Sequence, residues 1–317
     1  MKTVLITGAA GNLGSLLACH MAGLQDIQLR LMIHRKNLPD SLKEIPASNI
    51  FRADLSDPSS LDDSLRGTDA VIHFAGVLFK HKPEKFLPLT NTVYFKNLLD
   101  KAIEHGVKRV ILISFPHVEG ETTPDAPAVG KINAKPSSVH ATTRLEEEKY
   151  LFSMQQKHDF EAVSLRVGMV YGRGILMIDG ARWFAKYKLL GVWRKPTWIH
   201  LVSTRDFLES CKSALLNEKV KGIYHIGDEG IQTLQDFLDL ACMQWGYKKP
   251  WRMSVGLIMT AARIFEFWSF VFGTRSPLTR DFIRIGMASY YGDTTSMRKE
   301  LLPELRYKTV EDGKATL

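Results

Sequence analysis

The chain has 317 residues, of which 45% are hydrophobic, and a formal net charge of +8. Its length and apolar content allow a large buried core, so a disordered chain and a low-complexity chain are excluded. The positive charge is not gathered in a dense run of Lys and Arg, and no nucleic-acid module accompanies it, so we interpret it as diffuse surface charge and expect no nucleic-acid partner.

The chain opens with an apolar run, a glycine turn and a helix. Residues 4–6 are Val, Leu and Ile, which predict a buried strand, and residues 13–22 predict a helix. Between them Gly8, Gly11 and Gly14 recur at a spacing of three, which provides a tight turn, room for a pyrophosphate and close packing of helix on strand. The free N–H groups and the positive dipole end of the helix favour an anion, so this stretch predicts a dinucleotide site.

Residues 7–14, Thr-Gly-Ala-Ala-Gly-Asn-Leu-Gly, resemble the T-G-x-x-G-x-x-G fingerprint of the extended short-chain dehydrogenase/reductase superfamily, the epimerase/dehydratase-like proteins. The resemblance implies an α/β fold with a Rossmann-type, doubly wound parallel sheet and a smaller, mostly helical C-terminal lobe for the substrate. It also implies that the glycine turn binds the cofactor through Gly8, Ala10, Gly11, Asn12, Leu13 and Gly14.

A second strand is predicted over residues 28–33, and the basic sequence His34-Arg35-Lys36 follows it. An NAD-binding protein carries an acidic residue near this place to accept hydrogen bonds from the ribose, and that acid is missing. Cationic residues there favour a 2′-phosphate. We therefore expect NADP(H), bound in part by His34 and Arg35, with NAD(H) as the alternative.

A third strand is predicted over residues 49–54, followed by a helix that begins near Pro58 with Asp57 as its N-cap. The family resemblance implies that Asp54 and Leu55, at the end of this strand, contact the adenine.

The fourth strand, within residues 70–76, ends at a glycine and is similar to the family's N-x-A-G element. This similarity implies that backbone from Phe74 to Val77 borders the ribose and phosphates of the cofactor, which assigns Phe74, Ala75 and Gly76 to the cofactor site.

Strands and helices continue to alternate further along the chain. A helix is predicted over residues 90–105, with an apolar stripe formed by Val93, Leu98, Leu99 and Ala102. The remaining predictions are a strand at 107–114, a loop at 119–137, a helix at 138–156, a strand at 162–166 and a last strand at 221–227. Such alternation is typical of a parallel sheet covered on both faces, with ligands at the carboxyl ends of its strands.

The alternation divides the chain into two predicted units. Residues 1–172 and 202–228 form the expected dinucleotide-binding domain, and residues 173–201 and 229–317 form the expected substrate lobe. Residues 168–172, Gly-Met-Val-Tyr-Gly, resemble the segment beside the nicotinamide in the family, which places Val167, where proline is usual, in the cofactor site.

The expected catalytic residues differ from those of the family. The family resemblance calls for a Ser or Thr after the fifth strand and a Tyr-x-x-x-Lys on the next helix, and no Tyr-x-x-x-Lys occurs in this chain. At the corresponding places stand Phe115 and the sequence His140-x-x-x-Arg144, with Ser114 next to Phe115. We therefore name His140, Arg144 and Ser114 as catalytic candidates and expect no catalytic metal.

Two interpretations of this site remain open. In one, His140 replaces the tyrosine as acid/base, kept neutral by the neighbouring Arg144 cation, while Arg144 binds the nicotinamide ribose as the lysine does. In the other, hydride chemistry is lost, and the protein is a nucleotide-binding regulatory protein or sensor, or a non-redox lyase, isomerase or cyclase. We expect a carbonyl/alcohol oxidoreductase and keep both alternatives.

The substrate lobe is rich in aromatic residues. Aromatic residues at helical spacing usually form core, but they also fit an apolar substrate cleft or a helix lying in a membrane interface beside Arg252, Arg263 and Arg275. The aromatic residues concerned are Trp183, Phe184, Tyr187, Trp193, Trp198, Trp245, Trp251, Phe265, Phe267, Trp268, Phe270 and Phe272. The lobe resembles the steroid- and flavonoid-reductase branches, which implies a hydrophobic small-molecule substrate.

Three expectations concern the cell and the partners. The predicted strand starts so early that it leaves no room for a signal peptide, and the apolar stretch 257–272 is too short and too charged to span a bilayer. The cysteines Cys19, Cys211 and Cys242 have no paired or metal-binding spacing, so we expect a reducing, cytoplasmic setting. Peripheral membrane contact and a homodimer both remain open.

Overall fold

A computed structural model describes residues 1–76, 82–272 and 279–317, apart from the side chain of Phe270. Val77 and Arg275, which the sequence singles out, lie outside the described residues. The fold is α/β and centres on a seven-stranded sheet in which every neighbouring pair is parallel, as the sequence predicts. In spatial order its strands are β11 (Gly222–Ile226), β6 (Glu161–Val167), β5 (Arg109–Ser114), β4 (Ala70–His73), β1 (Lys2–Thr7), β2 (Ile27–Ile33) and β3 (Ile50–Arg52).

The strand order reverses between β1 and β4, and this switch point positions the site. Thr7 pairs with His73, so β1 and β4 end at the same level. In a doubly wound sheet the crevice outside such a point is where a dinucleotide binds. The glycine turn follows β1 directly, which brings it to this crevice.

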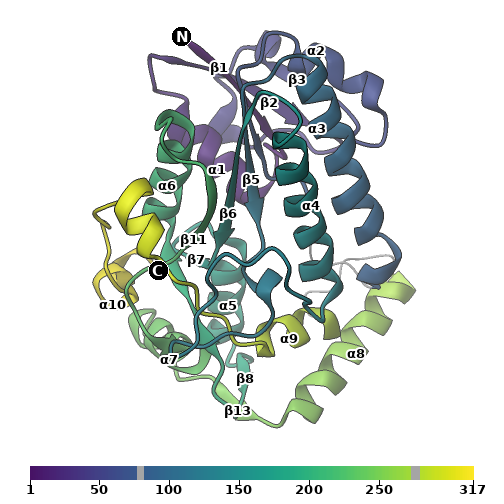
Figure 1. The fold of residues 1–317 in the computed structure, drawn as a ribbon. Helices are drawn as coiled ribbons and strands as arrows, with labels where there is room; N and C mark the ends of the chain where they lie inside the picture. The colour runs from purple at the N-terminus through teal and green to yellow at the C-terminus, as the bar shows by residue number, and fades with distance from the viewer. Residues whose placement is uncertain (77–81, 273–278) are drawn as a thin grey trace.

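Helices cover both faces of the sheet (Figure 1). The helices of the described chain are α1 (Asn12–Met21), α2 (Asp62–Leu65), α3 (Tyr94–Glu104), α4 (Val139–Gln155), α5 (Leu176–Lys186), α6 (Thr204–Leu216), α7 (Leu234–Gln244), α8 (Val255–Phe272), α9 (Arg280–Met287) and α10 (Val310–Gly313). None of them has the length and hydropathy that a bilayer crossing requires.

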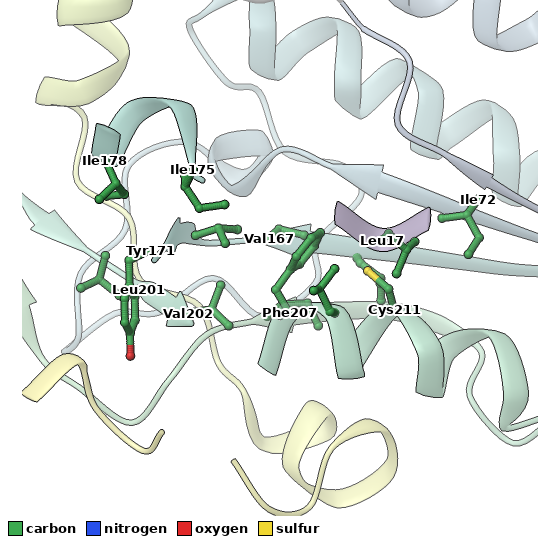
Figure 2. Packing of buried hydrophobic residues seen from close by; sticks show 14 of the residues in the cluster. Leu17, Ile72, Val167, Tyr171, Ile175, Ile178, Leu201, Val202, Phe207 and Cys211 are labelled. Atoms are coloured by element: carbon green, nitrogen blue, oxygen red, sulfur yellow. The ribbon is translucent and has the colours of Figure 1, made fainter. Parts of the chain in front are cut away.

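The side chains of β1 alternate between two apolar clusters, because successive residues of a strand point to opposite faces. Val4 and Ile6 belong to the cluster that includes residues of α1 and α6, and Leu5 belongs to the cluster that includes residues of α3 and α4. Figure 2 shows part of the first cluster, with Leu17 of α1 close to Phe207 and Cys211 of α6. The sheet is therefore buried on both sides, which holds its carboxyl ends in fixed positions.

The third strand and the third predicted helix differ from the sequence expectation. The strand is β3, shorter than the predicted 49–54. The predicted helix 90–105 begins as a π-helix, Pro88–Val93, before it continues as α3. The π-helical turn rotates the preceding residues around the axis, and Val93 is 43% exposed instead of lying in the buried stripe with Leu98 and Leu99.

The segments outside the main sheet combine helices with short strand pairs. The pairs are β7 (Met169–Tyr171) with β10 (Leu201–Ser203), β8 (Gly191–Trp193) with β13 (Trp251–Met253) and β9 (Trp198–Ile199) with β12 (Gln232–Thr233). Helix α8 lies at the edge of the molecule, with α9 and β8 as its neighbours (Figure 1). The C-terminal segments are thus less purely helical than expected, because small sheets join them.

Asp228, just after β11, is a buried carboxyl group with incomplete hydrogen bonding. Its side chain is 1% exposed, Oδ1 accepts a hydrogen bond of 2.9 Å from the Gly230 amide, and Oδ2 has no partner among the described residues. Burial, with Asp206 and Glu229 nearby, raises the pKa of Asp228 to about 7. The group is therefore protonated in the folded protein at a pH where the unfolded chain has released the proton.

We predict that Asp228→Asn removes a pH dependence of stability. Because the pKa of Asp228 is raised on folding, to about 7 from the ordinary 3.8, the wild-type free energy of unfolding should fall as pH rises across that interval. The neutral amide avoids the loss, so above neutral pH the variant should be more stable by about 2 to 4 kcal/mol. Urea unfolding from acidic to alkaline pH measures this, with Asp63→Asn on the surface as control. If the free energies of unfolding of Asp228→Asn and wild type change with pH in parallel, the prediction is contradicted.

Candidate functional site

The glycine turn after β1 is packed against the end of β4. Gly8 has a positive φ of 69°, and a Cβ atom there would lie 2.9 Å from the Ala75 amide nitrogen. A Cβ on Gly14 would lie 2.5 Å from the Gly8 carbonyl oxygen, and one on Gly11 would lie 3.0 Å from it. Backbone therefore fills the space that side chains would need, which agrees with the tight turn and the close packing of helix on strand expected from the sequence. The room for a pyrophosphate stays a prediction.

The start of α1 is free to receive an anion. Gly11 is its N-cap, no side chain caps it, and its first turn contains no acidic residue. Ala10 and Leu13 pack partly on the core, while Asn12 is tied to the segment before α5: its Nδ2 donates to Gly174 O at 2.6 Å and its Oδ1 accepts from Leu176 N at 2.9 Å. The cradle and the uncapped amides fit the diphosphate of a dinucleotide.

The end of β4 is held to β1 by side chains as well as by the ladder. The Thr7 hydroxyl is 2.8 Å from His73 Nδ1 and accepts a 3.4 Å hydrogen bond from the Ala75 amide. Burial, with a smaller effect of the Arg144 cation, lowers the pKa of His73 to about 3. The imidazole is therefore neutral, and its hydrogen bond with the Thr7 hydroxyl helps to fix the backbone of Phe74 and Ala75 beside the glycine turn.

Arg144 of α4 reaches this same strand end. A Cβ on Gly76 would lie 2.3 Å from Arg144 Nη2, so the guanidinium lies directly against the Gly76 backbone. Its Nη1 is 2.7 Å from Glu147 Oε2, and the Glu147 side chain is fully buried. Burial raises the pKa of Glu147 above its ordinary range, and the Arg144 charge opposes that rise. Glu147 thus holds Arg144 in place from beneath.

The π-helix before α3 packs on α4 next to Arg144. Asn91 Nδ2 donates to Thr143 Oγ1 at 3.0 Å, and Thr92 Oγ1 donates to Glu146 Oε2 at 2.9 Å. Asn91 Oδ1 is buried without a partner among the described residues and lies 3.9 Å from the Cβ position on Gly76. An unsatisfied acceptor beside Arg144 and Gly76 fits a hydroxyl group of a bound ligand.

The opposite end of the crevice carries the basic residues after β2. His34 and Arg35 are exposed, and His34 Nε2 is 3.3 Å from Asp54 Oδ2. Hydrogen bonds from the backbone and side chain of Ser56 lower the pKa of Asp54, so this carboxylate stays ionised. Leu55 is partly buried, and its carbonyl accepts a hydrogen bond from Asn97. The crevice end thus combines cationic side chains with one carboxylate.

His140 is paired with a carboxylate that the sequence does not single out. His140 Nε2 is 2.8 Å from Asp281 Oδ2 of α9, and the imidazole is buried. The ring centroid of Phe115 is 6.2 Å from that of His140. Arg144 makes its ion pair with Glu147, so His140 and Arg144 contact two different carboxylates. An ionised carboxylate only accepts, so Nε2 carries the hydrogen and Nδ1 is the nitrogen left for another partner.

Ser114 and Val167 lie in buried surroundings. Ser114 Oγ donates to Glu148 Oε1 at 2.5 Å, and the same carboxylate binds the Arg166 guanidinium, which has no exposed surface. Ser114 is therefore directed into a buried ionic cluster. Val167, at the end of β6, is 6% exposed and packs in the core of Figure 2.

Sequence reasoning missed Asp281 and Glu147. Glu147 follows Arg144 by three residues on one helix, a spacing that places two side chains on the same face, so it was accessible to a pattern search. Asp281 lies 141 residues after His140 in the chain. No local pattern joins the two, because only the packing of α9 against the start of α4 brings them together.

Comparison with known proteins identifies the family to which this chain is similar. Residues 4–209 match the NAD dependent epimerase/dehydratase family. The chain is 30% identical over 165 residues to a uronate dehydrogenase of Pseudomonas putida and 29% identical over 182 residues to a UDP-glucose 4-epimerase of Vibrio cholerae. These matches cover 52% and 55% of this chain and 60% and 53% of the relatives. The chain therefore spans little more than half of the length of these relatives.

The fold extends over the whole chain in a solved structure. A dTDP-glucose 4,6-dehydratase from Bacillus anthracis, determined in complex with NAD, superposes with a TM-score of 0.77 at 15% identity. The superposition covers 100% of this chain and 95% of that one. At this identity the likeness establishes the shared fold.

We predict that Gly14→Ala weakens dinucleotide binding. The new Cβ would meet the Gly8 carbonyl, a backbone atom that moves only if the turn moves, so affinity should fall about tenfold or more. Gly23→Ala is the matched control, because nothing lies within 4 Å of its Cβ position. Calorimetric titration with NAD(H) and NADP(H) measures the effect, and thermal unfolding checks the fold. Equal affinities in the two variants would show that the turn does not bind the cofactor.

Proposed function

Because this chain belongs to the NAD dependent epimerase/dehydratase family, we propose that it is an NADP(H)-dependent carbonyl/alcohol oxidoreductase in which His140 replaces the usual tyrosine. The observation that carries the proposal is the arrangement on α4. His140 is oriented by Asp281, and Arg144, one helical turn later, lies against Gly76 at the crevice. We assign residues 1–172 and 202–228 to cofactor binding and residues 173–201 and 229–317 to the substrate lobe.

The residues of the crevice account for cofactor binding in this proposal. The turn from Gly8 to Gly14 receives the diphosphate at the start of α1, and Arg144 with Asn91 Oδ1 offers hydrogen bonds to the nicotinamide ribose. Asp54 and Leu55 border the adenine end. A bound nicotinamide dinucleotide supplies the hydride for a carbonyl carbon, or accepts it from an alcohol.

His140 performs the proton transfer in this proposal. Its Nε2 donates to the Asp281 carboxylate, which holds one tautomer and one ring orientation, as a buried carboxylate does for a catalytic histidine. Protonated at Nδ1, the imidazole gives its proton to the oxygen of the carbonyl that is being reduced, and the neutral ring takes the proton back from an alcohol. Phe115 supplies no hydroxyl, so the Ser or Thr contribution is absent.

We infer a hydrophobic small molecule as the substrate. The family match ends at residue 209, before residues 229–317, which form the larger part of the proposed substrate lobe, so the substrate class rests on this chain's own residues. The Phe115 ring beside His140 gives the reaction centre an apolar wall.

We also propose a reducing, cytoplasmic setting. Cys19, Cys211 and Cys242 are free thiols, which agrees with this proposal.

A nucleotide-binding regulatory protein without turnover is the second candidate, and one observation favours it. The nitrogen of His140 that is furthest from its backbone, Nε2, is already engaged by Asp281. If that contact blocks the substrate oxygen, the protein retains its cofactor site and loses the reaction. Tight NADPH binding without absorbance change across a broad panel of ketones and alcohols would favour this candidate.

We predict that Arg35→Ala discriminates between the two cofactors. Arg35 is exposed beside the Asp54 end of the crevice, where a 2′-phosphate would lie. The loss of the Arg35 side chain should weaken the binding of NADPH about tenfold more than the binding of NADH, because only the 2′-phosphate of NADPH loses a charge-assisted contact. Titrations with both cofactors measure this, with Lys43→Ala as a control, since Lys43 already pairs with Asp40. Equal losses would refute the preference for NADP(H).

We predict that His140→Gln lowers kcat for a responsive ketone about 100-fold or more, because it removes the acid/base group, while NADPH affinity is kept. Asp281→Asn should lower kcat less and alter its pH profile, because the imidazole loses its orienting carboxylate. His158→Gln on the surface is the matched control. Activity that survives His140→Gln would show that another group transfers the proton.

A further inference from the structure

The outer side of α8 is apolar and exposed. Its large side chains on this side are each more than half exposed, and their spacing of seven, three, one, three and one residues places them along one side of the helix. They are Leu257, Ile264, Phe267, Trp268, Val271 and Phe272. The rings of Trp268 and Phe272 are 4.4 Å apart. The expectation that the aromatic residues of this lobe form core is therefore wrong for Phe267, Trp268 and Phe272 of α8, although it holds for Trp193 and Trp245.

The other side of α8 packs against the protein. Ile258 and Ala262 face inward, and Glu266 accepts hydrogen bonds of 2.8 and 2.7 Å from the backbone and side chain of Arg280 of α9. Packing thus fixes the helix and turns its apolar side outward. Monomeric proteins rarely leave a continuous patch of this kind in water, so its exposure indicates a binding surface.

A second segment with exposed apolar residues lies beside α8. Strand β13, just before α8, pairs with β8, just after α5, and Trp251 Nε1 donates to Lys188 O at 2.9 Å. Trp251, Trp183, Tyr187 and Leu189 are each more than half exposed. We call the solvent-accessible side chains of residues 182–195 and 248–272, as far as the structure describes them, the basic apolar surface.

Charge identifies the partner of the basic apolar surface. These two segments contain nine lysines and arginines and one glutamate, a net charge of +8, which equals the formal net charge of the whole chain. The basic residues are Arg182, Lys186, Lys188, Arg194, Lys195, Lys248, Lys249, Arg252 and Arg263. The two segments that carry the exposed aromatic residues are thus rich in Lys and Arg, and two of these basic residues, Lys249 and Arg252, are ion-paired with Asp239 of α7. This local excess of positive charge differs from the diffuse surface charge expected from the sequence.

We propose that the basic apolar surface docks the protein on an anionic lipid bilayer, with α8 lying in the interface. Aromatic and aliphatic side chains would enter the boundary between headgroups and acyl chains, and the surrounding Lys and Arg would contact lipid phosphates. One apolar element alone binds a membrane weakly, and a basic cluster supplies the second contribution that stable binding needs. This contact is peripheral.

A second copy of the chain fits this surface less well. A two-fold symmetric dimer places the same patch of each subunit against the other, so two surfaces of the same positive charge would meet. An anionic bilayer matches both the charge and the apolar side chains. A homodimer through this surface is therefore the outcome that the experiment must separate from lipid binding.

The test is sedimentation of the full chain with vesicles. We expect binding to phosphatidylcholine vesicles that contain about 30% phosphatidylglycerol, at least about tenfold weaker binding to phosphatidylcholine alone, and loss at about 1 M salt. Phe267→Gln with Trp268→Gln, and separately Lys248→Glu with Arg263→Glu, should each weaken binding about tenfold or more. Met243→Gln, an exposed apolar residue on α7, is the matched control. Thermal unfolding and NADPH titration show that each variant is folded.

Three results would overturn the proposal. One is a folded wild-type protein that stays in the supernatant with anionic vesicles at low salt. Another is vesicle binding that neither double variant weakens. The third is a concentration-dependent dimer, measured by ultracentrifugation, that Phe267→Gln with Trp268→Gln dissociates while vesicle binding is absent. None of these readouts needs catalytic turnover, so they are independent of the proposed oxidoreductase activity.

Discussion

The close approach of the glycine turn to the end of β4 is the constraint on which the site depends. A Cβ at Gly8 would meet the Ala75 backbone, and one at Gly14 would meet the Gly8 carbonyl. The parallel register of Thr7 with His73 requires this contact, because it ends both strands at one level. Helix α1 can start directly at the crevice only because no side chain separates it from the strands. The open start of α1 beside the glycine turn is therefore a consequence of backbone packing.

Two ion pairs position the side chains of the candidate site on α4. Arg144 is supported by the buried Glu147, and His140 is paired with Asp281. Arg144 and His140 therefore each contact a carboxylate of their own. Because the two side chains use different carboxylates, Arg144 lies against Gly76, and Asp281 contacts only Nε2 of His140 and not Nδ1. In the function that we propose, the two groups contact different parts of a bound ligand. Removal of the buried Glu147 would leave Arg144 without its carboxylate and destabilise the fold, whereas removal of the partly exposed Asp281 would mainly release the orientation of His140.

Helix α9 links this centre to the exposed helix α8. Arg280 is bound by Glu266 of α8, and the next residue, Asp281, contacts His140. The same short helix therefore takes part in the position of α8 and in the orientation of the candidate acid/base. A hydrophobic substrate of the kind that we propose, if taken up from a lipid surface, would arrive next to this helix and the Phe115 ring beside His140.

The sequence by itself determined the parallel α/β fold, the glycine turn and the place of His140 and Arg144 on one helix. These features depend on local patterns: apolar runs, the three-residue glycine spacing, and the four-residue spacing that puts two side chains on one helical face. Only the tertiary structure decided which carboxylate His140 contacts, since Asp281 is 141 residues away in the chain. It also decided that the aromatic residues of α8 face outward, because helical periodicity shows that a helix has an apolar side but not whether a neighbour covers it.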